Sequence, residues 1–318
     1  MQRTLSIAPM MDCTDRHYRY FMRLITRHTL LYTEMVTQDA ILHGDREKLL
    51  GFTPVESPLA LQLGGSDPKK LADCARIGEQ WGYDEINLNV GCPSDRVQAG
   101  RFGACLMKEP LLVSECLAAM RAAVKIPVTI KTRIGVDDQD SYEALCEFIR
   151  AIIQSGVQVI VVHARKAWLQ GLSPRQNREV PPLRYDLVYQ LKQEFPDLTL
   201  VINGGIETLE AIDSHLAQVD GVMLGRAAYN DPYLFAAADA SYYQDHSVPR
   251  TREQVVEAML PYIDQHLARG GRLHQITRHM VGLYHGVDGA RVWRRWLSTE
   301  CVKSGADARV LRKILTSA

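Results

Sequence analysis

The chain lacks the sequence patterns that mark membrane-spanning, secreted and zinc-binding proteins. Every apolar run falls short of the roughly 18 residues that a bilayer-spanning helix needs. Residues 1–20 do not resemble a signal peptide, because they carry five charged side chains around a short apolar strand: Arg3, Asp12, Asp15, Arg16 and Arg19. The 7 cysteines form no Cys-x-x-Cys pair and no zinc-ligand spacing, and their odd number argues against a closed disulfide framework. We therefore expect a cytoplasmic protein with no metal, no membrane segment and no obligate protein partner.

Charge is balanced over the whole chain but not along it. The 37 Lys and Arg residues equal the 37 Asp and Glu residues, so the formal net charge is zero. Residues 246–318 hold twelve basic and six acidic side chains, a net charge of +6, which leaves −6 for residues 1–245. At 318 residues the chain also exceeds the usual limit for one core, which is about 250 to 300 residues. A large domain followed by a small basic one is therefore expected.

Eight apolar runs bounded by turn residues predict eight strands. Most are apolar at consecutive positions, as parallel strands buried on both faces are. Segments with helical spacing separate them, for example Pro68–Trp81 and Ser141–Ser155. Strand and helix alternating eight times predict an α/β protein with a (β/α)₈ TIM barrel. The eight runs are Leu5–Met10, Leu30–Val36, Leu59–Gly64, Tyr83–Val90, Val128–Arg133, Val159–Ala164, Leu198–Asn203 and Gly221–Gly225.

The pattern changes after Asn230-Asp231-Pro232. Glu253–Ala268, Leu273–Tyr284 and Val292–Thr299 have helical spacing with no strand between them. We therefore predict a catalytic barrel domain over residues 1–240 and a small all-helical domain over residues 247–318.

Polar residues stand at the predicted carboxyl ends of the strands, where barrel enzymes keep their active sites. Asn89 lies in the fourth run and Cys92 follows it, Lys131 lies in the fifth, and His163 lies in the sixth. One such residue is most often a satisfied structural group. A set of them along the same edge favours a functional site.

The last two strands end in glycine motifs, Asn203-Gly204-Gly205 and Gly225-Arg226. Glycines at these two strands let backbone N–H groups approach a phosphate, and the arginine would add a charge-assisted contact. Together with Lys131 they indicate a phosphorylated cofactor, and Gln62 and the backbone near Met10 could hydrogen-bond a flat heterocycle. FMN meets these needs. No Gly-x-Gly-x-x-Gly follows the first strand, so a Rossmann-bound dinucleotide is not supported.

Cys92 has a structural and a functional interpretation. Free cysteines are often buried small hydrophobes, and Cys92 could be one. An ordinary thiol has a pKa of about 8.5, so it is mostly protonated near neutral pH and can act as an acid. No adjacent histidine favours a thiolate nucleophile, and Cys105 is the weaker competitor because it begins an apolar segment.

Seven short motifs follow one another at the strand ends. They are Ala8-Pro9-Met10-Met11-Asp12, Leu61-Gln62-Leu63, Asn87-Leu88-Asn89-Val90-Gly91-Cys92-Pro93-Ser94, Lys131-Thr132-Arg133, Val162-His163-Ala164-Arg165, Asn203-Gly204-Gly205-Ile206 and Gly225-Arg226-Ala227. In this order they resemble the tRNA-dihydrouridine synthase family. The segment Lys166–Pro174 and the sequence Trp293-Arg294-Arg295-Trp296 look closest to its bacterial A-type branch.

The resemblance implies an FMN enzyme that uses NADPH to reduce a uridine of the tRNA D-loop to 5,6-dihydrouridine, at position 20 and also 20a. It implies hydride transfer from flavin N5 to uracil C6 and a proton from Cys92 to C5. Asn89 could pair with the uracil edge, since the base must leave its stack to reach the flavin. The residues that the resemblance assigns to FMN are Pro9, Met10, Met11, Gln62, Lys131, His163, Asn203, Gly204, Gly205, Gly225 and Arg226.

The resemblance also assigns tRNA contacts to Arg175, Arg178, Arg291 and Arg294, which makes the helical domain a tRNA-binding one. Arginines interleaved with tryptophans suit phosphate contacts and stacking, but a solvated basic face over a tryptophan core has the same pattern. Two other functions compete. An FMN barrel acting on a free pyrimidine or a dihydroorotate-like molecule would leave the basic tail unexplained, and a non-catalytic RNA-binding barrel would contain no flavin.

Overall fold

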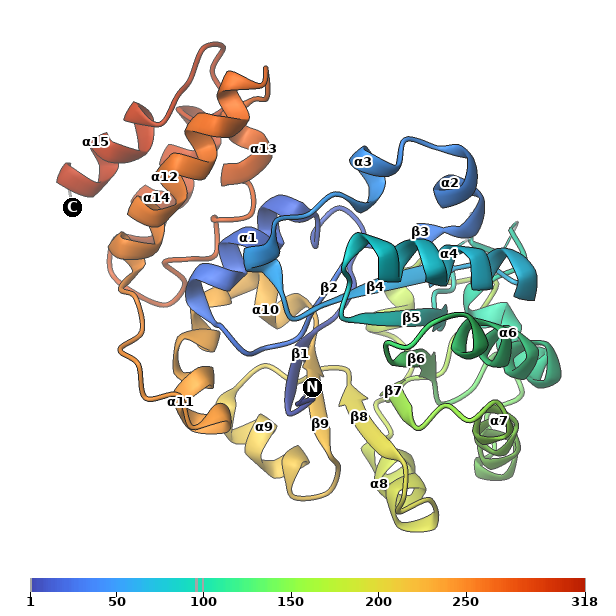
Figure 1. Ribbon diagram of the computed structural model, residues 1–318. Coiled ribbons are helices and arrows are strands. Elements are labelled where there is room, and N and C mark those ends of the chain that lie inside the picture. The colour runs from blue at the N-terminus through green and yellow to red at the C-terminus, as the bar shows by residue number, and fades with distance from the viewer. Residues whose placement is uncertain (1, 95–96, 99, 318) are drawn as a thin grey trace. The chain divides into compact units, whose positions relative to one another are not determined.

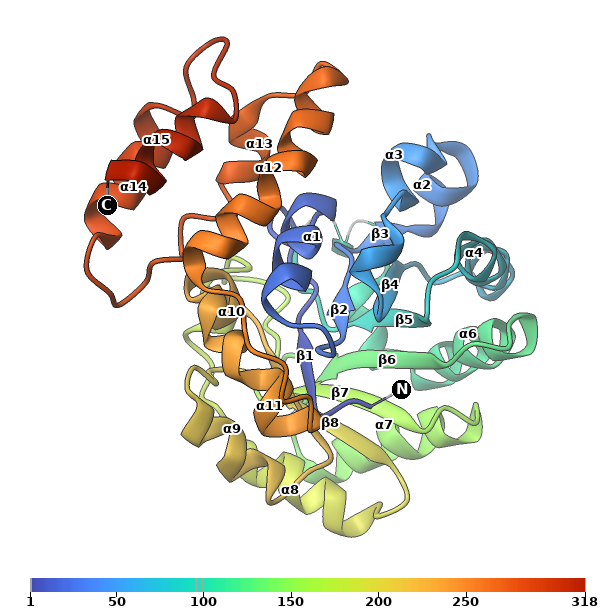
Figure 2. The same cartoon turned by 60° about the vertical axis from the view of Figure 1, so that its left-hand side comes forward.

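A computed structural model describes residues 2–94, 97–98 and 100–317 (Figures 1 and 2). The chain divides into two compact units, each formed by several segments. The barrel unit comprises Met1–Met10, Leu30–Phe52 and Ser57–Gly225. The helical unit comprises Met11–Thr29, Thr53–Glu56 and Arg226–Ala318.

The barrel unit is built on one sheet in which every pair of neighbouring strands is parallel. A parallel bridge between Ser6 and Leu30 joins its two ends, with the Ile7 N–H donating to the Leu30 carbonyl at 2.9 Å. The predicted (β/α)₈ barrel is therefore confirmed. Its strands are β1 (Leu5–Ile7), β2 (Leu31–Tyr32), β3 (Val36–Thr37), β4 (Leu59–Gly64), β5 (Glu85–Val90), β6 (Val128–Arg133), β7 (Val159–His163), β8 (Thr199–Asn203) and β9 (Gly221–Leu224).

The second predicted strand differs from the prediction because it is broken into β2 and β3, both of which pair with β4. Between them the Gln62 N–H donates to the Thr33 hydroxyl at 3.0 Å instead of to a backbone carbonyl. A side chain thus replaces one backbone acceptor of the ladder, and the regular strand is interrupted there.

Helices cover the outside of the barrel (Figures 1 and 2). Side-chain caps fix where they begin. The Asp67 carboxylate accepts the Lys70 N–H at 3.0 Å, and the Ser141 hydroxyl accepts the Ala144 N–H at 3.1 Å. The helices of this unit are α2 (Gln38–His43), α3 (Arg46–Leu50), α4 (Pro68–Trp81), α6 (Pro110–Ala123), α7 (Tyr142–Gln154), α8 (Tyr185–Glu194) and α9 (Leu209–Leu216), with the short 3₁₀ segments η2 (Gly103–Lys108) and η3 (Gln176–Arg178).

A cluster of buried apolar side chains, among them Tyr32, Val161, Val201 and Met223, lies in the core of the barrel unit. Met10, just after β1, is only partly buried and packs against this cluster. The apolar cluster thus extends to the residue just after β1.

The helical unit contains the tail and also a helix that the sequence assigned to the barrel. α1 joins this unit through buried contacts, since Arg19 pairs with Glu56 at 2.8 Å and the Tyr18 hydroxyl donates to the Ala228 carbonyl at 3.0 Å. The domain boundary between residues 240 and 247 therefore stays a prediction. The helices are α1 (Arg16–Ile25), α10 (Arg226–Asn230), α11 (Ala238–Tyr243), α12 (Arg252–Ala268), α13 (Leu273–Thr277), α14 (Ala290–Thr299) and α15 (Arg309–Ser317), with η1 (Pro54–Glu56) and η4 (Pro232–Ala237).

Candidate active site at the carboxyl ends of the strands

Cys92 lies in the loop after β5, and Asn89 of that strand forms hydrogen bonds to the loop backbone. The Asn89 side-chain oxygen accepts the N–H groups of Gly91 and Cys92 at 3.1 and 3.0 Å. The Cys92 carbonyl in turn accepts the Ala104 N–H at 2.9 Å. The thiol is free, partly buried and 3.6 Å from the Ser94 hydroxyl. The first catalytic candidate thus stands at the barrel's carboxyl end.

A chain of amides inside the barrel fixes the orientation of Asn89. Its nitrogen donates to the Gln62 oxygen at 2.9 Å, Gln62 donates to Asn87 at 2.8 Å, and Asn87 donates to the Thr129 hydroxyl at 2.8 Å. Asn87 and Asn89 point inward together because side chains alternate along a strand. Asn89 keeps a second N–H that a bound ring could use.

This amide chain continues to a buried carboxylate at the other end of the barrel, which sequence reasoning missed. Glu85 is fully buried and pairs with Arg3. Its other oxygen accepts the hydroxyls of Tyr32, at 2.9 Å, and Thr129. Burial and the nearby Glu85 raise the pKa of Tyr32 well above its usual value, which keeps the phenol a donor. A glutamate at the first position of a buried strand was the available signal.

Three basic side chains, Lys131, Arg133 and His163, gather at the carboxyl end. The Lys131 ammonium donates to the Asn203 side-chain oxygen at 3.1 Å. Burial, with the nearby Arg133, lowers the pKa of Lys131 to about 7, although Cys92 acts in the opposite direction. Burial and the same cations hold the pKa of His163 well below its usual value.

Among the described residues, Lys131, Arg133 and His163 form no ion pair with a carboxylate, and the His163 ring has no hydrogen-bond partner. Buried cations without a counter-charge are costly unless a ligand compensates them. This donor set fits an anionic or electron-rich group. Within the same described part of the chain, no cluster of three His, Cys, Asp or Glu side chains could hold a metal ion.

The glycine motif after β8 forms a turn that requires glycine. Gly204 and Gly205 have φ angles of 120° and 67°, and a Cβ on Gly204 would lie 2.7 Å from the His163 ring. The Tyr185 hydroxyl donates to the Gly204 carbonyl at 2.6 Å. The turn therefore brings backbone within reach of whatever occupies the space beside His163.

Most of the residues predicted to bind FMN lie in the barrel unit, close to these strand ends. A Cβ on Gly225 would be 3.8 Å from Met10, so β1 and β9 place those two residues together. Met11 and Arg226 belong to the helical unit, and both are exposed. The barrel-unit members are Pro9, Met10, Gln62, Lys131, His163, Asn203, Gly204, Gly205 and Gly225.

The segment 165–184, called the arginine loop below, holds two predicted tRNA contacts. Arg175 and Arg178 are exposed on it, and Arg175 lies 3.5 Å from Glu179. Asn177 is fully buried beneath them and accepts the Trp168 N–H at 2.7 Å. The side chain of Asn177 also donates to the carbonyls of Trp168, Leu172 and Ser173. Sequence reasoning missed this organising role, which a single asparagine in a polar loop does not signal.

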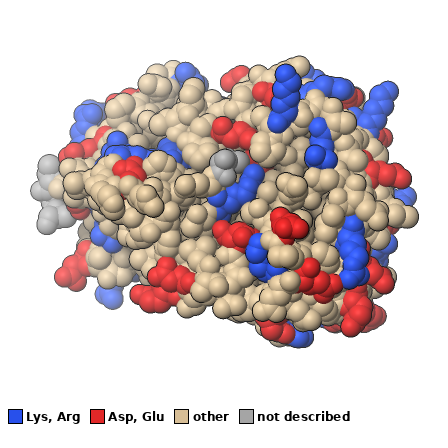
Figure 3. All heavy atoms as spheres, turned by 60° about the horizontal axis from the view of Figure 1, so that its bottom comes forward, with Lys and Arg blue, Asp and Glu red and all other residues tan. Residues whose placement is uncertain are grey.

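The other two predicted tRNA contacts lie on α14. Arg291 and Arg294 are exposed, whereas Trp293 is buried and donates from its indole nitrogen to the Met280 carbonyl at 2.9 Å. The Trp296 indole donates to the Val310 carbonyl at 2.9 Å. Trp293 is therefore a core residue, as the alternative interpretation had it, whereas Trp296 is only partly buried. On the face drawn in Figure 3, basic side chains are interspersed with acidic ones, without a block of one sign.

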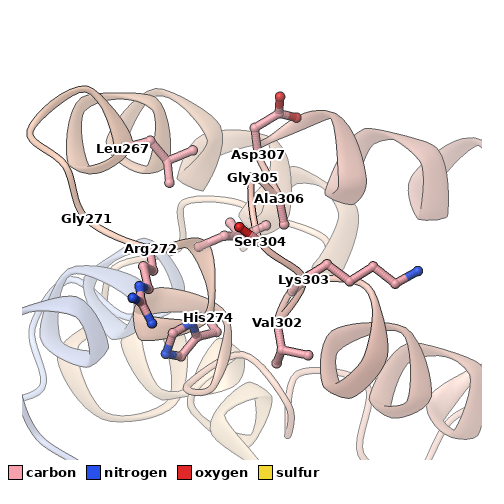
Figure 4. A pocket seen from close by; sticks show the side chains of 12 residues that line it. Leu267, Gly271, Arg272, His274, Val302, Lys303, Ser304, Gly305, Ala306 and Asp307 are labelled. Atoms are coloured by element: carbon pink, nitrogen blue, oxygen red, sulfur yellow. The ribbon is translucent and has the colours of Figure 1, made fainter.

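The helical unit also contains a hollow of about 460 Å³ between residues 267–274 and residues 301–307 (Figure 4). Two of its charged residues have partners. Lys303 pairs with Glu300 at 2.5 Å, and Asp307 pairs with Arg309 at 2.6 Å. The hollow thus differs from the strand ends, where the buried cations have no carboxylate partner.

A parallel barrel with a cationic, thiol-bearing carboxyl end defines a class of barrel enzymes, and comparison with known proteins specifies the family. The model of the family described as dihydrouridine synthase matches residues 6–318. The chain therefore belongs to the dihydrouridine synthases, which are flavin-dependent oxidoreductases.

Curated relatives agree with this family over nearly the whole chain. The chain is 59% identical over 311 residues to a protein of Synechocystis sp., covering 98% of this chain and 93% of the relative. It is 59% identical over 312 residues to one of Shewanella oneidensis, with the same coverage, and 58% identical over 311 residues to one of Salmonella typhi, again with that coverage. All three relatives are named tRNA-dihydrouridine(20/20a) synthase.

One solved structure shares the fold at low identity. It is a 2-naphthoyl-CoA reductase in complex with 2-naphthoyl-CoA, with a TM-score of 0.58 and 11% sequence identity. The match covers 79% of this chain and 51% of the reductase chain.

No helix among the described residues is both long and apolar enough to cross a bilayer.

Proposed function

We propose that this chain is a tRNA-dihydrouridine synthase that reduces uridines at positions 20 and 20a of tRNA to 5,6-dihydrouridine, with FMN as cofactor and NADPH as electron donor. One observation carries the proposal: the basic side chains of Lys131 and His163, which have no carboxylate partner in the described chain, lie at the same barrel end as the Cys92 loop. Relatives 58–59% identical are named for this activity. The activity belongs in the cytoplasm, where tRNA is available.

The strand ends fit FMN by their chemistry. Lys131 and His163 would face the part of the flavin that becomes electron-rich, and the turn at Gly204 and Gly205 would bring backbone N–H groups to the phosphate. Pro9, Met10, Gln62, Asn203 and Gly225 would complete the binding site from the barrel unit. Once reduced by NADPH, bound FMN would supply a hydride to uracil C6.

Cys92 is the acid of the reaction. Hydride addition at C6 leaves enolate character across C5 and O4, and a proton must then reach C5 from the opposite face. A protonated thiol can supply it. The hydrogen bonds from Gly91 and Cys92 to Asn89 fix the backbone that carries the thiol, so little reorientation is needed. The second N–H of Asn89 is a donor for a uracil oxygen.

The exposed arginines bind the tRNA. Arg175, Arg178, Arg291 and Arg294 offer guanidinium groups for phosphates. The target base must leave its stack to reach the barrel end, as in other enzymes that modify bases.

Mapping dihydrouridine in cellular tRNA tests this function. Transfer RNA is isolated from a strain that lacks the endogenous enzyme for positions 20 and 20a, with and without this chain supplied on a plasmid. We expect dihydrouridine to return at these positions only. Its absence there, with the protein folded and flavin-bound, would contradict the proposal.

A further inference from the structure

The loop that carries Cys92 is tied to the arginine loop by the side chain of Arg133. Its Nε–H donates to the Gly91 carbonyl at 2.8 Å, next to the thiol-bearing residue. Its Nη1 donates to the carbonyls of Lys166 and Asn177, both at 3.0 Å. One buried guanidinium at the end of β6 thus holds backbone of two loops that are far apart in sequence.

A second side chain makes the same connection from the other direction. The Gln98 amide nitrogen donates to the Pro93 carbonyl at 2.9 Å and to the Leu169 carbonyl at 2.6 Å. The carbonyls of the residues before and after Cys92 are therefore both held by groups that also bind the arginine loop.

The arginine loop is itself hydrogen-bonded at the attachment points. Asn177, whose carbonyl accepts from Arg133, closes the loop through its hydrogen bonds with Trp168. It lies between the exposed Arg175 and Arg178 in sequence and is fully buried. RNA bound to those arginines would therefore contact a loop that is hydrogen-bonded, through Arg133, to the Cys92 loop.

We propose that Arg133 is a positioning residue that couples the arginine loop to the Cys92 loop, with Gln98 as a second tie, so that RNA held by the first loop meets a thiol in fixed register. This inference rests on the proposed function for the identity of the RNA. Lysine cannot replace arginine in this role, because one ammonium cannot reproduce the fork of N–H groups that reaches three carbonyls.

Hydrogen exchange followed by mass spectrometry on the purified full-length protein tests the tie without any turnover. In Arg133→Lys we expect the amides of segments 91–94 and 166–177 to exchange faster together, and in Gln98→Ala to a smaller extent. Arg121→Lys is the matched control, since Arg121 also donates to a backbone carbonyl, that of Ser155, at 2.8 Å on the outer helices. It should leave both segments unchanged.

Kinetics with unmodified tRNA then separate positioning from charge. Arg133→Lys should lower kcat by about 10- to 100-fold, because small displacements of a reacting group are costly, with little change in KM. Arg175→Ala should raise KM instead. A charge-only role predicts that Arg133→Lys keeps its kcat, and that result would overturn the proposal.

Two further outcomes decide the matter. Faster exchange spread over the whole barrel, with a parallel loss in Gln98→Ala, would make both residues general supports and contradict a specific tie. If the wild-type protein makes no dihydrouridine, the proposed function fails, whereas joint loosening of the two segments would still support the tie.

Discussion

The two ends of the barrel interior both contain buried charge, but only one end compensates it. At the amino end, Glu85 is fully buried and satisfied by Arg3, Tyr32 and Thr129. At the carboxyl end, the partly buried Lys131 and the buried Arg133 and His163 have no carboxylate partner in the described chain.

The difference separates structure from function. A paired charge inside a fold supports a specific arrangement, whereas an unpaired one is tolerated only where something else supplies the opposite charge. Four predictions test this distinction, beginning with the largest expected effect.

The chemistry at the carboxyl end should depend on one thiol. Cys92→Ala should lower the rate of dihydrouridine formation by about 10²- to 10⁴-fold, because a positioned acid contributes that much. Single-turnover assays on unmodified tRNA measure the rate. Cys105→Ala is the control, and its thiol, which donates to the Phe102 carbonyl at 3.1 Å, should be dispensable. Full activity of Cys92→Ala would contradict the role of Cys92 as the proton donor.

The amino end should matter for stability. Arg3→Met should lower the free energy of unfolding by about 3–5 kcal/mol, because it leaves Glu85 buried without its partner. Lys131→Met, in the cofactor-free protein, should leave stability equal or higher, since it removes an uncompensated cation. Denaturant titration compares the two. A larger loss for Lys131→Met would reverse the contrast between the two ends.

The uncompensated lysine should make stability depend on pH. Its folded pKa of about 7 lies below the usual value of 10.5, so the unfolded chain binds more protons between these values. Stability of the cofactor-free protein should therefore rise by about 2 kcal/mol from pH 7 to pH 9. Lys131→Met should lack this gain. Equal pH profiles for the two proteins would show that Lys131 titrates normally.

The exposed arginines should contribute only electrostatically, in contrast to the buried cations. Arg294→Ala should weaken tRNA binding several-fold and reduce the slope of log K against log salt by about 1, with kcat unchanged. Arg269→Ala, another exposed arginine of the helical unit, is the control. An unchanged salt slope for Arg294→Ala would show that Arg294 on α14 does not contact the tRNA phosphates.

Much of the barrel could be predicted because parallel strands buried on both faces leave a clear apolar signal. Six of the eight predicted runs end within one residue of the observed strands, for example β5 at Val90 and β6 at Arg133. The second run was wrong as a single strand because Thr33 supplies a side-chain acceptor there, which the residue type alone does not indicate.

The site could be predicted in part. Lys131 and His163 were identifiable because their strand positions were, and the structure places them with Asn203 and Gly204. The ties made by Arg133 and Asn177 were not, because they join backbone carbonyls of distant loops. A carbonyl has no sequence signature, so only the folded chain reveals which side chain it accepts from.

The most direct test of the central claim uses purified protein reconstituted with FMN and NADPH, offered unmodified tRNA and free pyrimidines in parallel. The account predicts dihydrouridine at positions 20 and 20a of the tRNA and negligible reduction of free uracil, uridine or orotate. Reduction of a free pyrimidine with the tRNA left unmodified would contradict it.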